Sequence, residues 1–520
     1  MQQSIVHQLV RITKSKILIA MALLLSCGFK TYAQDEGFFS IYENPEHDYI
    51  PSCIIETNDG GFILAAYDDS RSPSILYKLS ERGEILKRAI LEIGDHNACV
   101  VLDRIYQDAS LHKQYCAIGC IHYLSEQVSK PFVLHFDDDL NFTETHVVDL
   151  PGDFRQFIME RAILASDGEF LFATSLGQQN GFHRLYMKIA TDGTLLSFHE
   201  ATEDCSSGRM INAIFEFPDG GYYGDYRSAS TGLGGFSLQL FGFGEDFVFD
   251  TIGEFLEIRD TTYSVLPGTL ANGTALAFGE NSLLFADRAG EFYGPGSQHD
   301  NSTLLTMTDL EGNLCKHMVI GSMNDTADYP IVFNAIDYKE PSANETHQNE
   351  VFYAGCFGTN NGWYPINRPN HLTIAQIDSE FEICWKKTFT HHSKYLLPTY
   401  LLATDDGGLI VAGAAFKNDH YDLFALKINS DGMLDCDEIV AEDIRPYDFW
   451  PNPAKGILNL QYSPDITPTR IELYDLQGRL VRRQTTALEC INMEGLAAGT
   501  YMMRVTLQGG KVFSDKVVKE

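Results

Sequence analysis

Residues 394–440 contain the repeat unit that decides the fold. They read KYLLPTYLLAT, the turn Asp405-Asp406-Gly407-Gly408, LIVAGAAF, a polar loop, YDLFALKI, a second turn Asn429-Ser430-Asp431-Gly432, and MLDCDEIV. Short runs rich in branched and aromatic residues, separated by Asp-Gly turns that need a residue at positive φ, are typical of antiparallel hairpins. The stretch predicts one four-stranded sheet in the order strand, turn, strand, loop, strand, turn, strand.

Six further copies of this unit precede it. One such sheet cannot bury both faces alone, so the copies must stack. The repeats predict an all-β fold, a seven-bladed (six to eight) β-propeller of four-stranded antiparallel blades, because radial stacking covers each sheet on both faces. Phe38–Tyr42 precedes the first copy and is placed to supply a strand that closes the ring. A pair of β-sandwiches is the structural alternative, but it does not require this period. The first turns are expected at 58–61, 108–113, 166–168, 218–221, 271–273 and within 339–350, and the second turns at 80–83, 137–139, 191–193, 244–246, 310–312 and 378–380.

The repeat resembles a family of exported proteins. GGFILAAY at 60–67, followed by LYKLSERGEIL at 76–86, is similar to the Asp-Gly-Gly repeats common in exported proteins of the Bacteroidetes. The resemblance covers about 400 residues at low stringency. It supports the propeller and implies little about activity, because one fold hosts many functions.

The N-terminal segment has the pattern of a secretory signal peptide. Residues 1–16 carry Arg11, Lys14 and Lys16 and no acid, and an apolar run too short to span a bilayer follows. Thr31-Tyr32-Ala33 supplies small residues for cleavage before Gln34, so we expect residues 1–33 to be removed. A membrane anchor is one alternative, and a lipoprotein box at Leu24-Leu25-Ser26-Cys27 is the other.

The cysteines do not form the pattern of a dense disulfide framework. Cys315 and Cys384 occupy positions where other copies have Leu86 and Leu196, which predicts buried, small apolar side chains. Cys116 and Cys120 lie about 13 Å apart on one strand, too far to pair with each other. The sequence has no CxxC and no HExxH, so we expect no cysteine- or histidine-based metal site and no cofactor.

The net charge of −33 lies in the middle of the chain. Residues 1–33 hold four basic side chains and no acid, and residues 447–520 hold nine basic and eight acidic ones, which leaves −38 for the rest. Such a surface repels phosphate backbones and anionic lipids, so we expect no nucleic-acid partner. The charge also keeps a secreted protein soluble. We expect no transmembrane segment in the mature chain.

The topology of the repeat separates two ends of each blade. Both tight turns lie at one end, and the loops between second and third strands lie at the other, where ligands usually bind. The distinctive loops are expected at 279–302 and 357–371. Their aromatic and amide side chains are suited to stacking on a sugar and bonding its hydroxyls. Packing of the loop against its own blade is the alternative role. The candidate ligand-binding residues are Tyr293, Asn360, Asn361, Trp363 and Tyr364.

No catalytic motif stands out. The chain has 71 acids, so a glycosidase pair of carboxylates cannot be chosen from the sequence. The Asp-Gly motifs are turn formers first, and they lack the spaced oxygen ligands of a calcium loop. We therefore expect no catalytic residue. The expected function is a non-catalytic binding module for an extracellular glycan or protein, and a propeller polysaccharide hydrolase or lyase is the alternative.

After residue 440 the pattern changes. Residues 441–448 form a polar linker, and residues 449–520 alternate strands with Gly turns, which predicts a small β-sandwich. PNPAKG (451–456), IELYDLQGRLV (471–481), GLAAGTY (495–501) and KVVKE (516–520) resemble the type A C-terminal sorting domain of type IX secretion cargo.

This second resemblance implies where the protein is exported. It implies recognition by the type IX machinery at the outer membrane, export via the periplasm of a Gram-negative member of the Bacteroidetes, and release from or attachment to the cell surface. A cut between about residues 436 and 447 is implied as well. The propeller is then expected at 34–440. The implied sorting determinants are Pro451, Asn452, Pro453, Gly499, Tyr501 and Lys516.

Overall fold

The structure is a computed structural model with two compact units that divide between Ala441 and Glu442. It describes residues 37–520 except 69–73, 94–97, 108–113, 124, 153, 155–156, 179–180, 202–209, 217–221, 230–235, 244–248, 252–263, 266–273, 280–281, 291–300, 310–313, 321–326, 340–349, 360–369, 418–419, 435–438, 444–446, 451–452, 463–466, 476–477 and 509–511. The expected signal peptide therefore lies outside the described residues.

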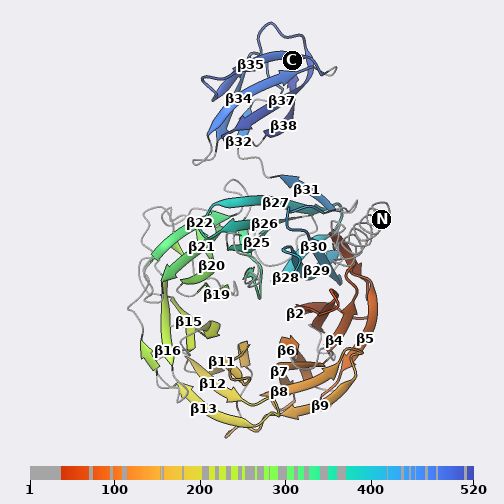
Figure 1. Cartoon of the computed structure of the whole chain (residues 1–520), viewed down its shortest axis with the longest axis vertical. Coiled ribbons are helices and arrows are strands. Elements are labelled where there is room, and N and C mark those ends of the chain that lie inside the picture. Colours follow the sequence, from red (N-terminus) through yellow and green to blue (C-terminus); the bar gives the residue numbers. More distant parts are fainter. Residues whose placement is uncertain are drawn as a thin grey trace, which may run out of the picture. The chain divides into compact units, whose positions relative to one another are not determined.

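The first unit is a β-propeller whose described strands form seven antiparallel sheets around a central axis (Figure 1). Blade 1 contains β2 (Tyr49–Glu56), β3 (Phe62–Asp68), β4 (Ser74–Leu79) and β5 (Ile85–Leu91). Blade 2 contains β6 (Ala98–Gln107), β7 (Gln114–Tyr123), β8 (Val128–Asp137) and β9 (Phe142–Val147). Blade 3 contains β10 (Phe157–Leu164), β11 (Phe170–Gln178), β12 (Gly181–Ile189) and β13 (Leu195–Ala201). Blade 4 contains β14 (Met210–Glu216), β15 (Tyr222–Ala229), β16 (Phe236–Phe243) and β17 (Phe249–Thr251).

The last three blades depart from this simple order. Blade 5 contains β18 (Ser264–Val265), β19 (Thr274–Phe278), β20 (Ser282–Gly290), β21 (Asn301–Asp309) and β22 (Leu314–Ile320). Blade 6 contains β23 (Ala327–Pro330), β24 (Ile336–Tyr338), β25 (Val351–Thr359), β26 (His371–Asp378) and β27 (Ile383–His391), with β31 (Ile439–Asp443) added at its outer edge. Blade 7 contains β28 (Tyr395–Ala403), β29 (Leu409–Lys417), β30 (His420–Ile428) and β1 (Phe38–Tyr42).

The closure of the ring confirms one expectation and corrects another. Phe38–Tyr42 is β1, and it pairs with β30 so that Phe38 lies opposite Lys427 and Tyr42 opposite Leu423. The prediction that residues 433–440 supply the fourth strand of this blade was wrong, because β1 occupies that edge and β31 pairs with β27. A strand from the far end of the chain joins the first and last blades, which a local hairpin cannot do.

The inner hairpin of blade 5 is also a correction. The turn expected at 271–273 lies before β19, whereas the tight connection to β20 is at Gly279, whose φ is +59°. The segment 279–302, expected as a loop, therefore includes the whole of β20. Glycine occurs on both sides of TALAF, so turn chemistry alone does not say which side of that strand turns.

In blades 2 and 6, the tight turn between the third and fourth strands contains a residue other than glycine in the left-handed conformation. Leu140 has φ +54° and Phe381 has φ +64°, and both side chains are buried in the inter-blade cores. The Phe381 ring lies 5.5 Å from that of Phe352. Burial of a large side chain offsets a strain of about 1 kcal/mol, because it gains more than that from leaving water.

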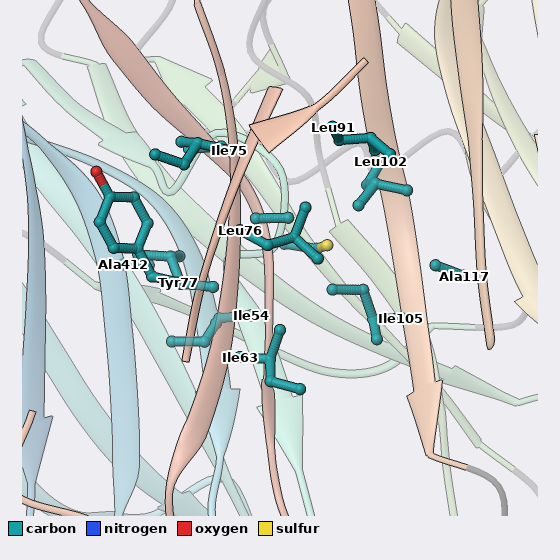
Figure 2. Packing of buried hydrophobic residues seen from close by; sticks show 14 of the residues in the cluster. Ile54, Ile63, Ile75, Leu76, Tyr77, Leu91, Leu102, Ile105, Ala117 and Ala412 are labelled. Carbon is teal, nitrogen blue, oxygen red and sulfur yellow. The ribbon is translucent and has the colours of Figure 1, made fainter. Parts of the chain in front are cut away.

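Apolar packing holds neighbouring blades together (Figure 2). Ile54, Ile63 and Leu76 of blade 1 are buried in one cluster with Leu102 and Ile105 of blade 2. The rings of Tyr42 and Tyr77 stack with their centroids 6.0 Å apart, which ties the closing strand to blade 1.

The outer strands are more exposed than the sequence suggests. Cys315 and Cys384 are exposed, so the prediction that they are buried was wrong. Leu86 is 57% exposed and Leu196 is 46% exposed, so the leucines at equivalent positions do not mark a buried site either. Cys315, Leu86 and Leu196 lie on outermost strands that have no neighbour of their own sheet on the outer side, which leaves these side chains open to water. Cys384 lies on β27, which pairs with β31, so an open edge does not explain its exposure.

The second unit contains two packed sheets. One has the order β32 (Tyr447–Trp450), β33 (Ile457–Tyr462), β36 (Cys490–Asn492). The other has the order β35 (Leu480–Gln484), β34 (Pro468–Tyr474), β37 (Gly499–Leu507), β38 (Val512–Lys519). Leu458 and Ile491 of the first sheet share a buried core with Ile471, Met503 and Val517 of the second.

Candidate functional site

The tight turns of the propeller form one end of the blades, which we name the turn face. In three blades an aspartate of the first turn accepts a hydrogen bond from the backbone N–H two residues later, and its carboxylate meets a lysine of the third strand. The lysine–aspartate pairs are Lys78–Asp59 at 3.4 Å, Lys188–Asp167 at 2.6 Å and Lys427–Asp406 at 2.6 Å. Because the device recurs from blade to blade, it holds the hairpins rather than a single ligand.

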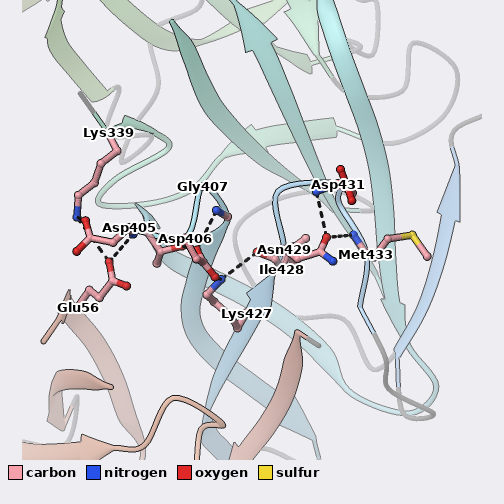
Figure 3. A network of polar contacts seen from close by, with 12 residues as sticks. Glu56, Lys339, Asp405, Asp406, Gly407, Lys427, Ile428, Asn429, Asp431 and Met433 are labelled. Carbon is pink, nitrogen blue, oxygen red and sulfur yellow. Dashed lines mark hydrogen bonds and ion pairs between the residues drawn. The ribbon is translucent and has the colours of Figure 1, made fainter. Parts of the chain in front are cut away.

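The Asp406 pair shows the balance of forces in this device (Figure 3). Burial favours the neutral acid, but Lys427 and the hydrogen bonds from Thr404 and Gly408 outweigh it, so the pKa of Asp406 is lowered. The network continues to blade 1, where the Lys339 ammonium lies 3.5 Å from Glu56 and also meets Asp405.

Carboxylates on the inner strands bind the backbone of the neighbouring blade. The pairing register of most inner strands shifts at one point, as at a β-bulge. These strands are β2, β6, β10, β14 and β28. An inner strand is also an edge of its sheet, so some of its backbone N–H groups have no partner in the ladder. In four places an acid accepts a hydrogen bond from a backbone N–H group of an adjacent blade. The pairs are Asp103 with Ala162 N–H (2.8 Å), Asp337 with Ala403 N–H (2.8 Å), Glu56 with Asp405 N–H (2.7 Å) and Glu216 with Ser166 N–H (2.6 Å).

Two of these acids are electrostatically unusual. Burial raises the pKa of Asp337 to about 6, although backbone hydrogen bonds and the charge of Arg104 act in the opposite direction. Burial also raises the pKa of Glu56. The guanidinium of Arg104, on β6 of blade 2, lies 5.2 Å from the ring centroid of Tyr400 on β28. Side chains from blades 2, 6 and 7 therefore interact near the axis.

At the opposite end of the blades, which we name the loop face, aspartates meet histidines in several blades, and Asp422 also meets Lys394 at 2.7 Å. In blade 6, His371 Nε2 lies 2.8 Å from Asp328, whose side chain is fully buried. In blade 1, His47 Nδ1 lies 2.8 Å from the buried Asp68. At the closure of the ring, His420 lies 2.8 Å from Asp48.

The pair in blade 6 is shaped by its neighbours. A Cβ at Gly358 would lie 2.0 Å from the His371 ring, so only glycine leaves room for the imidazole. Burial lowers the pKa of the nearby Lys386 and raises that of the Cys356 thiol well above its usual value. An unreactive, protonated thiol follows from that environment.

Asn370, directly before β26, is held by the neighbouring blade. Its side chain exchanges two hydrogen bonds with the backbone of Leu396 in blade 7, at 2.7 and 2.8 Å. Residues 370 and 371 are thus held by blade 7 and by Asp328 respectively.

The expected ligand-binding residues, Tyr293, Asn360, Asn361, Trp363 and Tyr364, lie outside the described residues. So do Pro451 and Asn452 of the expected sorting signal. Pro453 is exposed, and Gly499 begins β37. Tyr501 is buried in the core of its unit and donates a hydrogen bond to Ala497 at 2.7 Å. Lys516 is exposed on β38.

The inner-strand acids and the loop-face histidines were missed by the sequence reasoning. A signal for the acids exists: Asp103-Arg104 interrupts the apolar run ACVVL, and Glu56 ends another such run. The histidine–aspartate pairs have none, because His371 and Asp328 are 43 residues apart. Within the described part of the chain, no group of three metal-ligating side chains comes together, and no helix is long and apolar enough to cross a membrane.

Comparison with known proteins identifies the second unit. Residues 448–520 match the family model of the secretion system C-terminal sorting domain. No protein of curated function has a sequence that matches the chain.

The propeller has solved relatives in fold at low identity. Polysaccharide lyase Uly1 is 9% identical with a TM-score of 0.44, over 75% of this chain and 92% of that one. The β-propeller domain of the Trilobed protease from Pyrococcus furiosus is 9% identical with a TM-score of 0.41, over 75% and 98%. A protein of unknown function from Dyadobacter fermentans is 10% identical with a TM-score of 0.39, over 75% and 97%.

The seven radial sheets and the sorting domain together define a class: an exported β-propeller protein. The chain is cargo of the type IX secretion system, and it is secreted or held at the cell surface.

Proposed function

We propose that the propeller is a non-catalytic module that binds an extracellular glycan or protein through its loop face. The observation that carries this proposal is that the described inner-strand acids Asp103, Asp337, Glu56 and Glu216 each accept a backbone N–H from an adjacent blade. An acid used in this way at several blades acts as a structural clamp. The segment 357–371, for which the sequence predicts a loop of this face, contains Trp363 and Tyr364.

A binding assay that also detects cleavage tests this function. The mature chain, residues 34–520, is incubated with a panel of host and plant glycans, and both retention and product mass are recorded. We expect a glycan to be retained at its original length, and we expect W363A/Y364A to lose retention. The exposed turn-face variant Glu81→Ala serves as a control and should bind normally. A shortened glycan contradicts the non-catalytic proposal. If no glycan of the panel is retained or shortened, a protein ligand is favoured.

A polysaccharide hydrolase or lyase is the second candidate, and one observation favours it. Asp337 has its pKa raised to about 6 and feels the charge of Arg104, a combination suited to proton transfer near neutral pH. If product appears in the glycan assay, Asp337→Asn should abolish it. Product formation that is unchanged in that variant removes Asp337 from any catalytic role.

The proposed export route and domain bounds go beyond what the sorting domain alone provides. We infer a signal peptide at 1–33, passage through the periplasm of a Gram-negative member of the Bacteroidetes, and a propeller at 34–440 joined by residues 441–448 to the sorting domain at 449–520. Deletion of 449–520 should keep the protein inside the cell. A truncated chain that still reaches the outer surface contradicts the sorting assignment.

A further inference from the structure

The four-stranded sheet of the sorting domain has one face toward the core and one face away from it. Along β34, Ile471 and Leu473 are fully buried in the core, so Arg470, Glu472 and Tyr474 point to the opposite face. The same alternation along β37 directs Met503 and Val505 inward. It directs Met502 and Arg504 outward, opposite Tyr474 and Glu472.

The outward face is basic. Arg483 lies opposite Glu472 on β35, and Lys516 lies opposite Met502 on β38. Among the residues of these four strands, Glu472 and Asp515 are the only acids, and Asp515 alternates to the other side, where Tyr447 donates to it at 2.5 Å. The face therefore carries one carboxylate and four cations, Arg470, Arg483, Arg504 and Lys516. We name these five residues, with Tyr474 and Met502, the arginine face.

Glu472 organises this face. Its carboxylate receives Arg483 Nε at 2.7 Å and the Tyr474 hydroxyl at 3.1 Å, and Arg470 Nε lies 3.5 Å away. It is only 3% exposed although it sits on an outward sheet face, because side chains cover it. Burial favours its neutral form, but the hydrogen bonds from Arg483 and Tyr474 outweigh that effect, so its pKa is lowered.

The arginines remain open to a partner. The side chain of Arg483 is 55% exposed and that of Arg470 is 40% exposed. Met502 is 45% exposed between them and Lys516. Arginine, tyrosine and methionine are residue types that are enriched at protein interfaces. The excess of cations on this face favours a partner of the opposite sign.

We propose that the arginine face is the surface by which the sorting domain docks on an acidic, partly apolar protein surface of the type IX secretion machinery. The partner supplies carboxylates to the exposed arginines and apolar side chains to Met502 and Tyr474. Glu472 is a positioning residue, because it holds Arg470 and Arg483 in place for that partner. This proposal does not depend on what the propeller binds.

Export of the full chain from a type IX-competent bacterium tests the proposal. The face variant R470Q/E472Q/R483Q/R504Q removes three cations together with the carboxylate they cover, so no buried acid loses its partner. The control variant K455Q/R479Q removes two exposed cations elsewhere on the same domain. Both changes lower the net charge by two. We expect the control to export normally, and the face variant to fall by about tenfold at the surface and to accumulate inside the cell.

Two further measurements keep the outcome decisive. If the face variant melts below the native chain, the single change Arg504→Glu replaces it, and its export should fall by the same order. Sedimentation with vesicles of phosphatidylcholine and phosphatidylglycerol in equal parts tests a lipid partner, and we expect no binding. Normal export of a folded face variant overturns the proposal, and so does vesicle binding by the native chain that the face variant loses. The glycan retention of the propeller should be unchanged in every variant.

Discussion

Both faces of the propeller pair aspartates with cations, but the loop face uses histidine as well as lysine. On the turn face, lysines such as Lys427 meet turn aspartates, and the motif recurs along the chain. On the loop face, His371 and His47 meet aspartates that are fully buried. Lysine keeps its charge throughout the physiological range, whereas histidine gains and loses its charge within it. The comparison suggests that the turn face is a constant scaffold and that the loop face is individual to each blade.

The sharpest test of the scaffold is at the second turn of blade 1, where we expect the largest effect. A Cβ at Gly83, whose φ is +77°, would lie 2.3 Å from the Phe38 ring of the closing strand. Gly83→Ala should cost about 3 kcal/mol, from left-handed strain plus displacement of that ring. Gly60→Ala is the matched control, because φ is +81° but nothing lies within 4 Å, and it should cost about 1 kcal/mol. Equal losses in urea unfolding would show that the closing strand does not depend on this contact.

The buried pair of the loop face is the next test. His371→Ala removes the imidazole partner of a fully buried carboxylate and should cost about 2 to 3 kcal/mol. Gly358→Ala should be comparably damaging in the native chain because the new methyl group meets the His371 ring, yet nearly neutral once that ring is gone. Additive losses in this double-mutant cycle would mean that the two residues do not constrain each other.

A smaller loss is expected from the turn-face pair. Lys427→Met should cost about 1 to 2 kcal/mol at neutral pH, because Asp406 loses its ammonium but keeps the bonds from Thr404 and Gly408. The pKa of Asp406 is lowered in the folded chain, so the stability it contributes is present above its unfolded pKa and is lost as pH falls through the folded value. The difference between native and variant urea midpoints should therefore shrink in acid. A difference that is constant with pH would contradict this origin.

An effect of the opposite sign is expected at Asp337. Its pKa of about 6 means that the ionised form is disfavoured by the fold, so its contribution to stability falls as pH rises from about 4 to 6 and is constant above. Asp337→Asn keeps an oxygen for the Ala403 N–H and should stabilise the chain at pH 8 but not near pH 4. Unfolding midpoints measured at both pH values decide this, and a loss of stability at pH 8 would mean that the charge itself is required.

The amino-acid sequence by itself determined the repeat, the all-β propeller, the closing strand and the sorting domain. Each of these depends on local chemistry: Asp-Gly turns at positive φ, apolar runs of strand length and short motifs in order. The repeat period located the second turns at 137–139 and 378–380 although glycine is absent there, and the left-handed residues Leu140 and Phe381 directly follow them.

Only the tertiary structure decided which strands are neighbours and which side chains meet. β1 took the edge that residues 433–440 were expected to fill, and the clamp between Asp337 and Ala403 joins residues 66 positions apart. The exposure of Cys315 likewise depends on its place on β22, the outermost strand of its sheet. These contacts arise between blades, and no local pattern encodes them, because a repeat specifies each blade but not what the ends of the chain and the gaps between blades must do to close a ring.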